Sequence, residues 1–143
     1  MAGEWNIYTL GELCSKITDG SHQSPKSVDS GLPMASVKDL TRFGVNSKGA
    51  RLISEADFNV LVKQGCMPQK GDVLIAKDGN SALDTVCAVN KKPNYVLLSS
   101  VAILRPNPQR VNSNYLKYYF NSKQTLDYLK RNFISGAAIP RVI

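Results

Sequence analysis

Short blocks of apolar residues, separated by polar turns, run through the first two thirds of this chain. Residues 32–37 and 73–76 are apolar blocks of strand length, each bordered by glycine or polar turn residues, and we predict a strand in each. The second block is followed by the pair Asp78-Gly79 and then by another apolar block at residues 85–89. An Asp-Gly pair between apolar blocks favours a β-hairpin, so we expect these two blocks to pair through a polar tip.

The strongest apolar run covers residues 95–104. It is long enough for one central strand or for two short strands with an irregularity at residues 99–100. The segment 105–108 contains two prolines and is expected to stop the run, because proline cannot donate to a strand ladder. Residues 18–26 and 38–50 are rich in turn residues and lack a clear period, which predicts loops.

Helical periodicity appears in two segments. Residues 54–63 carry their apolar side chains on one face, and Ser54 is the expected N-cap. Residues 112–133 form a longer segment, and a break near residues 121–122 would keep its lysines away from the apolar face. A single helical turn, with Thr9 as its cap, is also expected near the N-terminus.

The chain has 143 residues, of which 43% are hydrophobic and 20% are charged, as in folded globular domains. A domain of this length buries roughly 70% of its unfolded surface, so we expect residues 1–143 to form a single domain. Cys14, Cys66 and Cys87 are odd in number and far apart, which favours buried, reduced thiols in a cytoplasmic protein. No apolar run approaches the roughly 18 residues of a membrane span, and no membrane association is expected.

The net charge of +7 is unevenly distributed. Residues 105–143 hold seven basic groups and one acid, Asp127, whereas residues 1–104 hold eleven basic and ten acidic groups. A basic end on a nearly neutral body favours a surface that faces a polyanion. The alternative explanation is a solvated helix face that is simply rich in lysine.

Residues of the common catalytic motifs are sparse. His22 is the single histidine, so a histidine-based triad or metal site would depend on it alone. Asp72 and Lys77 resemble part of a nuclease acid-lysine set, but Ile75 stands where that set requires Glu or Gln. Residues 107–110 resemble the start of an amino-methyltransferase motif but lack its aromatic residue, so a proline turn is preferred. We therefore expect no catalytic centre, no metal and no cofactor.

Two polar loops are the candidates for base recognition. The first, residues 18–26, offers hydroxyl, imidazole, amide and ammonium groups, and the second, residues 77–81, carries similar groups at the predicted hairpin tip. Glutamine can read adenine bidentately, and lysine can bind guanine or phosphate. With Lys38, which lies between the two loops in the sequence, the candidate DNA contacts are Thr18, Ser21, His22, Gln23, Ser24, Lys26, Lys38, Lys77, Asp78, Asn80 and Ser81.

Lys117 and Arg131 are the candidates for contacts with phosphate, because they share a polar stripe of the expected C-terminal helical segment. Phosphate contacts position a protein on DNA but carry no sequence information. Both sets of candidate contacts, in the loops and on the helix, also have an explanation that involves no DNA. The two loops are then ordinary surface turns, in which Asp78 and Asn80 bond their own backbone, and the lysine-rich helix face is simply solvated.

Several segments, taken in order, resemble one target recognition domain of a type I restriction-modification specificity subunit. The matching residues are Trp5 with Leu10-Gly-Glu-Leu13, Ile17-Thr-Asp-Gly-Ser-His22 with Pro25, Gly31-Leu-Pro33, Ile53-Ser54, Gly71-Asp-Val-Leu-Ile75 with Lys77-Asp-Gly79, Val101-Ala-Ile-Leu-Arg-Pro106, Tyr115-Leu-Lys-Tyr-Tyr-Phe120 and Ser135-Gly-Ala-Ala-Ile-Pro140. None of these motifs is specific alone, but their order and spacing cover almost the whole chain.

The resemblance implies an α+β fold with a curved, largely antiparallel or mixed sheet, a few peripheral helices and a helical C-terminal segment. It implies a non-catalytic protein that reads one half of a bipartite double-stranded DNA site through loops in the major groove. Its partners would be the methyltransferase subunits and the motor-nuclease subunit of the same system. The chain stops at Ile143, where the family's spacer helix would begin, so we expect one recognition domain of a longer, two-domain subunit.

Two other functions remain open from the sequence. The chain is alternatively the DNA-binding portion of a fused or stand-alone restriction endonuclease or methyltransferase, which metal-dependent cleavage by the pure chain would reveal. A further alternative is a protein-interaction module whose basic helix binds an acidic partner. A binding assay over a range of salt concentrations that shows no response to DNA would indicate this function.

Overall fold

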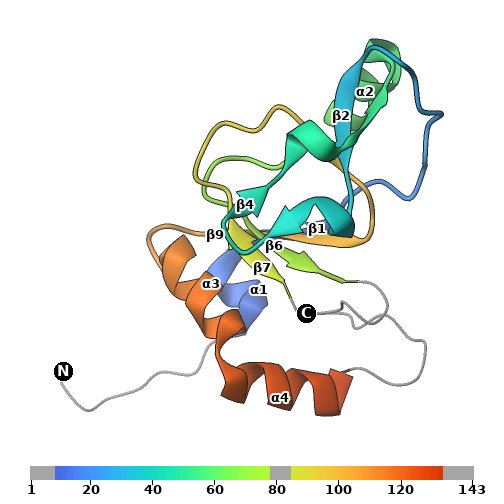
Figure 1. Cartoon of the computed structure of the whole chain (residues 1–143). Helices are drawn as coiled ribbons and strands as arrows, with labels where there is room; N and C mark the ends of the chain where they lie inside the picture. The colour runs from blue at the N-terminus through green and yellow to red at the C-terminus, as the bar shows by residue number, and fades with distance from the viewer. Residues whose placement is uncertain (1–8, 78–84, 134–143) are drawn as a thin grey trace, which may run out of the picture.

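A four-stranded antiparallel sheet forms the centre of the molecule, with strand order β1-β9-β6-β7 (Figure 1). The computed structural model describes residues 9–77 and 85–133. Non-local pairing dominates this sheet, because β1 pairs with β9 and β9 with β6. The bounds of its strands are β1 (Cys14–Asp19), β6 (Val73–Ala76), β7 (Val86–Ala88) and β9 (Val101–Pro106).

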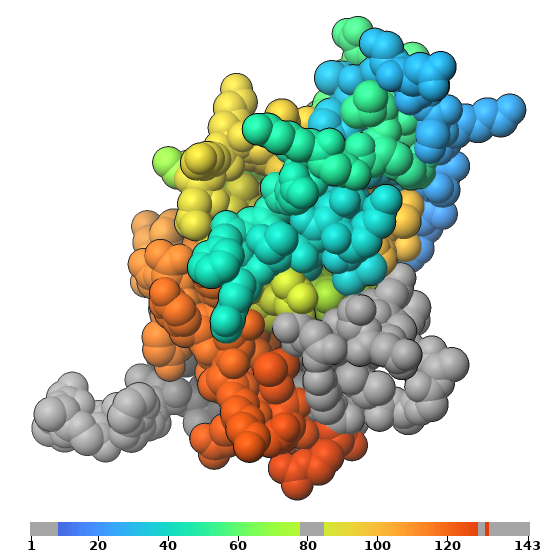
Figure 2. All heavy atoms as spheres, in the orientation of Figure 1, coloured from blue at the N-terminus to red at the C-terminus, as the bar shows by residue number. Residues whose placement is uncertain are grey.

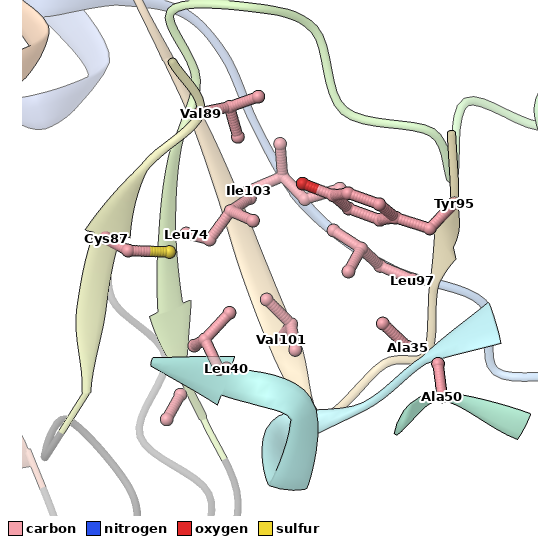
Figure 3. Close-up of a cluster of buried hydrophobic side chains, with 11 residues drawn as sticks. Ala35, Leu40, Ala50, Leu74, Cys87, Val89, Tyr95, Leu97, Val101 and Ile103 are labelled. Atoms are coloured by element: carbon pink, nitrogen blue, oxygen red, sulfur yellow. The ribbon is translucent and has the colours of Figure 1, made fainter. Parts of the chain in front are cut away.

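A three-stranded sheet, in the order β5-β2-β8, lies against one face of the central sheet (Figure 3). In it, β2 (Leu32–Ala35) pairs antiparallel with β5 (Arg51–Ile53) and parallel with β8 (Val96–Leu97). A small hairpin of β3 (Leu40–Thr41) and β4 (Gly44–Val45) contacts β7. Two 3₁₀ turns, η1 (Val37–Asp39) and η2 (Ser47–Gly49), flank the hairpin on either side.

The alternation of side chains along β6 explains its unbroken apolar sequence. Leu74 and Ala76 face the three-stranded sheet, whereas Val73 and Ile75 join the apolar cluster on the opposite face. Successive strand residues point to opposite faces, so both faces of this strand are buried. All four residues of β6 are 0% exposed, so this strand contributes side chains to two apolar cores.

Helices cover the remaining surfaces. α1 (Leu10–Leu13), α3 (Ser113–Asn121) and α4 (Lys123–Phe133) lie on the face of the central sheet away from the three-stranded sheet (Figure 1). α2 (Glu55–Lys63) packs on β2 and β8 through Phe58 and Leu61. No helix among the described residues is long and apolar enough to cross a membrane. Sheets inside and helices outside confirm the expected α+β class, with antiparallel and mixed pairing and a helical C-terminal segment.

Local signals placed several elements correctly. Ser54 caps α2, with its side-chain oxygen accepting a hydrogen bond from the Asp57 amide at 3.1 Å. Thr9 caps α1 in a capping box with Glu12. The predicted break in the C-terminal segment is confirmed at Ser122, which has extended backbone angles between α3 and α4. The run 95–104 forms two strands rather than one, because β8 and β9 belong to different sheets.

Two boundaries were wrong, whereas the predicted stop at residues 105–108 is confirmed, because β9 ends at Pro106. Residues 38–50, predicted as a loop, contain the β3–β4 hairpin. Thr18, predicted in a loop, lies in β1 and pairs with Ile103 of β9. In each case a partner strand decides the conformation, which local propensity does not report. Residues 135–140, which belong to the resemblance, lie outside the described residues.

Candidate nucleic-acid interface

The two strands that lead into the predicted base-contacting loops end at the same end of the central sheet. β1 and β6 both pair antiparallel with β9, so they run in the same direction and finish at the same end of the sheet. Gly20, the first residue of the loop after β1, and Lys77, the residue after β6, therefore both lie at this end. The turn before β9, residues 98–100, lies at this end too. We call it the loop end of the sheet.

Asp19 connects the two candidate loops. Its carboxylate accepts a hydrogen bond from Lys77 Nζ at 2.5 Å and lies 3.1 Å from His22 Nε2. The side chains of Lys77 and Asp19 are only 18% and 22% exposed, whereas that of His22 is 74% exposed. A partly buried pair is screened by salt less than a surface pair. The contact therefore fastens the base of the second loop to the end of β1.

The turn that follows β1 is held tightly. A β-carbon on Gly20 would lie 2.2 Å from the carbonyl oxygen of Leu97, so only glycine fits there. Ser21 is 4% exposed, and its hydroxyl donates to the Gln23 carbonyl and accepts from the Gln23 amide. The Ser21 amide donates to the Leu97 carbonyl at 2.8 Å. The Ser21 side chain thus holds the turn together, and the next three residues are exposed.

Arg51, on β5, holds the middle of the same loop. Its guanidinium donates to the Pro25 carbonyl at 2.6 Å, to Ser24 Oγ at 2.7 Å and to Ser27 Oγ at 3.2 Å. These bonds occupy both terminal nitrogens, so Arg51 shapes the loop from the three-stranded sheet. Sequence reasoning missed this residue, because Arg51 lies more than 20 residues after the loop in the chain. The pairing of β2 with β5 brings it next to the loop.

Ser100 joins the second loop to η1. Its carbonyl accepts a hydrogen bond from the Lys77 amide at 2.9 Å, and its hydroxyl accepts one from the Val37 amide at 3.0 Å. Lys38 follows Val37 in η1, and its side chain is exposed. These bonds bring Lys38 to the loop end, although it is distant from both loops in the sequence.

The predicted contact residues differ in their access to solvent. Thr18 is half-buried in β1. Asp78, Asn80 and Ser81 lie outside the described residues, and their base contacts stay predictions. The exposed members at the loop end are His22, Gln23, Ser24, Lys26 and Lys38. They combine hydroxyl, amide, imidazole and ammonium groups, which match the donors and acceptors of base edges and phosphates.

The predicted phosphate contacts lie on the helices that cover the opposite face of the sheet. Lys117, on α3, is half-buried, and its ammonium lies 5.6 Å from the centroid of a neighbouring tyrosine ring. Arg131, on α4, is exposed, and its Nε donates to a main-chain carbonyl of its own helix at 3.2 Å. Asn121, at the end of α3, donates to the carbonyl of Val86 at 3.4 Å. Because β7 begins at Val86, the junction of the two helices adjoins the loop end.

Asp72 and Lys77 do not form a common nuclease centre. Asp72 is 1% exposed, and both of its carboxylate oxygens accept hydrogen bonds from Arg105 at 2.9 Å. The hydrogen bond with Asp72 raises the pKa of the Arg105 guanidinium, which therefore stays charged. Asp72 precedes β6 and Lys77 follows it, and the four residues of β6 between them keep the two Cα atoms roughly 16 Å apart.

The remaining described residues form no cluster that could hold a metal ion, and their thiols are buried. Among the residues that the structure describes, no three His, Cys, Asp or Glu side chains are placed to hold a metal ion. The three cysteines are free and buried, as predicted. Burial raises the pKa of each thiol, that of Cys87 to about 11, so the thiols are protonated and weak nucleophiles at neutral pH. Residues 107–110 form a turn closed by the Arg110 amide and the Asn107 carbonyl at 2.8 Å.

Solved structures with this fold include two from type I restriction-modification systems. The chain matches the HsdS subunit from Thermoanaerobacter tengcongensis over 96% of its own length and 31% of that chain, with 22% identity and a TM-score of 0.59. It matches a chain from a structure on complex assembly and conformational transition of the type I R-M system over 88% of its length and 30% of that chain, with 23% identity and a TM-score of 0.52.

No protein-family model and no curated protein matches the sequence. The likeness is therefore one of fold, and the chain spans less than a third of the length of each protein that it matches. It covers almost all of this chain, including the sheets and helices that form the loop end. The chain thus has the fold of one part of an HsdS specificity subunit, the extent expected for a single target recognition domain.

Proposed function

We propose that residues 1–143 form one target recognition domain, which reads one half of a bipartite double-stranded DNA site. The observation that supports this most directly is the contact between Asp19 and Lys77, which joins the end of β1 to the first residue of the second candidate loop. The fold shared with part of an HsdS subunit supports the same function.

The rigid base of the loop end suits sequence-specific contact. Base recognition requires donors and acceptors held at fixed positions, because each misplaced hydrogen bond loses its discrimination. Gly20 packs against the backbone of Leu97, and Arg51 holds the loop at Pro25. His22, Gln23 and Ser24 would contact base edges in the major groove. Lys26 and Lys38 would contact guanine or phosphate beside them, and Lys117 and Arg131 would contact phosphates further along the duplex.

The proposed domain is non-catalytic. It directs methyltransferase subunits and a motor-nuclease subunit to the site, and those partners carry out the chemistry. The acid and the lysine that resemble nuclease residues have structural roles, since Asp72 pairs with Arg105 and Lys77 with Asp19. Half of a bipartite site provides few contacts, so we expect the chain alone to bind DNA with a dissociation constant of roughly micromolar or weaker.

A domain exchange tests the proposal. Residues 1–143 would replace one recognition domain of a specificity subunit of known target, and the methylated sequence of genomic DNA would be determined before and after the exchange. We expect one half of the methylated motif to change and the other half and the spacing to stay. Methylation with an unchanged motif would contradict half-site recognition.

The purified chain supplies the complementary measurement. Binding to duplexes that carry the new half-motif or a scrambled one would be measured over a range of salt concentrations. We expect affinity to fall steeply with salt for both duplexes and to be higher for the half-motif at each salt concentration. Cleavage of either duplex on addition of Mg²⁺ would favour the endonuclease alternative. Failure to bind either duplex at any salt concentration would favour the protein-interaction alternative.

A further inference from the structure

A hollow opens at the end of β7 away from the loop end. It lies between the β3–β4 hairpin and the segment that follows β7, which are seen as cyan and yellow spheres on the face shown in Figure 2. Its volume is about 470 Å³, near the lower end of the roughly 300–1,000 Å³ of small-molecule sites. The hollow takes no part in the contacts that form the loop end.

Tyr95 lines this hollow just before β8. The residue is only 7% exposed, yet its hydroxyl has no hydrogen-bond partner among the described residues. Figure 3 shows the hydroxyl pointing away from β8 toward Val89 and Ile103, and Val89 also lines the hollow. All fully enclosed side-chain nitrogen and oxygen atoms of the described residues have partners, so this hydroxyl remains open to a bound molecule.

Burial keeps this hydroxyl protonated. Desolvation, with smaller contributions from Cys87 and Asp72, raises the pKa of Tyr95 to about 12. The phenol is therefore a neutral group at physiological pH that can both donate and accept a hydrogen bond. Such a group can hydrogen-bond to a donor or an acceptor atom of a base that enters the hollow.

The rim of the hollow is basic and aromatic. Lys91 and Lys92 are both exposed, and the described lining contains no Asp or Glu. Phe43, at the turn of the β3–β4 hairpin, is 84% exposed and presents its ring at the edge. An exposed aromatic ring provides a surface on which a flat base can stack, and two lysines without a neighbouring acid favour a phosphate.

We propose that this hollow binds one nucleotide, with its base against Phe43, its phosphate at Lys91 and Lys92, and a hydrogen bond between the base and the Tyr95 hydroxyl. The shared chemistry is an aromatic base that carries a phosphate, whether free in solution or at the end of a DNA strand. The site is separate from the loop end, and it stands or falls independently of half-site recognition.

Calorimetric titration of the purified chain tests the ligand class. The probes are the four deoxynucleoside monophosphates, deoxyadenosine, inorganic phosphate and a single-stranded tetranucleotide. We expect at least one monophosphate to bind more tightly than both phosphate and nucleoside, because base and phosphate contact different groups. Tighter binding of the tetranucleotide would assign the site to a strand end, and preference for the monophosphate would assign it to a free nucleotide. Phosphate binding as tight as every monophosphate, or no binding at all, would overturn the proposal.

Single changes then locate the site. Tyr95→Phe removes only the hydroxyl and should weaken nucleotide binding about five-fold, the value of one hydrogen bond. The double change of Lys91→Ala and Lys92→Ala should weaken it about ten-fold at low salt and less at high salt. Lys63→Ala, which removes an exposed charge on α2, is the matched control and should have no effect.

Phe43→Ala tests the site without the risk of unfolding the domain, because this ring is exposed and contributes little to the core. It should weaken nucleotide binding about five-fold through lost stacking and leave the melting temperature unchanged. Unchanged nucleotide affinity in Phe43→Ala and in the lysine double variant would rule out this hollow as the site.

Discussion

Lys77 and Asp19 are 58 residues apart in the sequence, and their side chains meet at 2.5 Å at the end of the central sheet. We propose that this contact gives Lys77 a role in positioning the loop, in place of the direct DNA contact that a polar hairpin tip suggests. A free lysine at a tip would contact DNA directly. A lysine held by a carboxylate instead fixes where the loop begins, and the residues after it would make the contacts.

Removing this contact should reduce sequence discrimination more than overall affinity. Lys77→Ala leaves the second loop without its side-chain link to β1, and the free energy of unfolding should fall by about 1 kcal/mol. The ratio of the dissociation constants for a scrambled and a correct half-motif should decrease. Lys70→Ala, which removes an exposed lysine at the opposite end of β6, is the control and should leave this ratio unchanged.

Asp19→Asn separates positioning from direct contact. If Lys77 acts by positioning the loop, the Asn variant should lose discrimination to a similar extent as Lys77→Ala. Full discrimination in Asp19→Asn, with loss in Lys77→Ala, would show that the ammonium group itself contacts a base.

Arg51→Ala should loosen the first loop without unfolding the domain. The guanidinium supplies hydrogen bonds to Pro25, Ser24 and Ser27, and hydrogen bonds to a charged group contribute roughly 1.5–3 kcal/mol each at most. We expect amide hydrogen exchange to increase within residues 22–28 and sequence discrimination to fall. Arg51→Lys retains the charge but not the planar arrangement of donors, so discrimination should stay low in this variant as well. Recovery in Arg51→Lys would point to charge alone as the relevant property.

Lys117→Ala should weaken binding to all duplexes alike. This residue lies on α3, outside the loop end, and a phosphate contact is insensitive to the base sequence. The slope of log affinity against log salt should decrease by about one, as expected for one lost phosphate contact. Lys117→Arg should restore the slope. A change in sequence preference in Lys117→Ala would contradict the division between the loop end and the helices.

Gly20→Ala should strongly destabilise the domain. The added β-carbon would lie 2.2 Å and 2.3 Å from the carbonyl oxygens of Leu97 and Leu98, so the backbone must move. We expect the free energy of unfolding to drop by about 3 kcal/mol or more in urea denaturation. Gly11→Ala is the matched control, because its β-carbon would meet only Thr9 Oγ1 at 3.8 Å. That variant lies in α1 and should be neutral or slightly stabilising.

The ion pair of Asp72 and Arg105 should be visible in stability rather than in DNA binding. Asp72→Ala leaves Arg105 without its partner and the Gln69 amide without its acceptor, and the cost of breaking a buried pair is about 3–5 kcal/mol. The double variant Asp72→Ala with Arg105→Ala should lose less than the sum of the two single variants. Strict additivity would show that the two residues do not stabilise each other.

Local chemistry was sufficient to predict several elements of this fold. Ser54 caps α2, Asn112 caps α3, and the apolar block at 73–76 forms a strand buried on both faces. These features depend on residues within one turn or one strand of each other. A capping hydroxyl acts on an amide three residues away, and burial of a short apolar block needs no knowledge of its partner.

Long-range pairing determined what local chemistry could not. Thr18 and Asp19 are polar and stand in a turn-rich stretch, but β9 recruits them into β1. Arg51 and Ser100 have no local signal of a role, and they hold the two candidate loops from different sheets. Strand order joins residues that lie far apart, and side chains from three or four segments then meet at one end. The polar groups of both candidate loops were visible in the sequence, and their contacts with DNA stay predictions. The contact between Lys77 and Asp19, in contrast, depends on β1 and β6 sharing β9 as a neighbour.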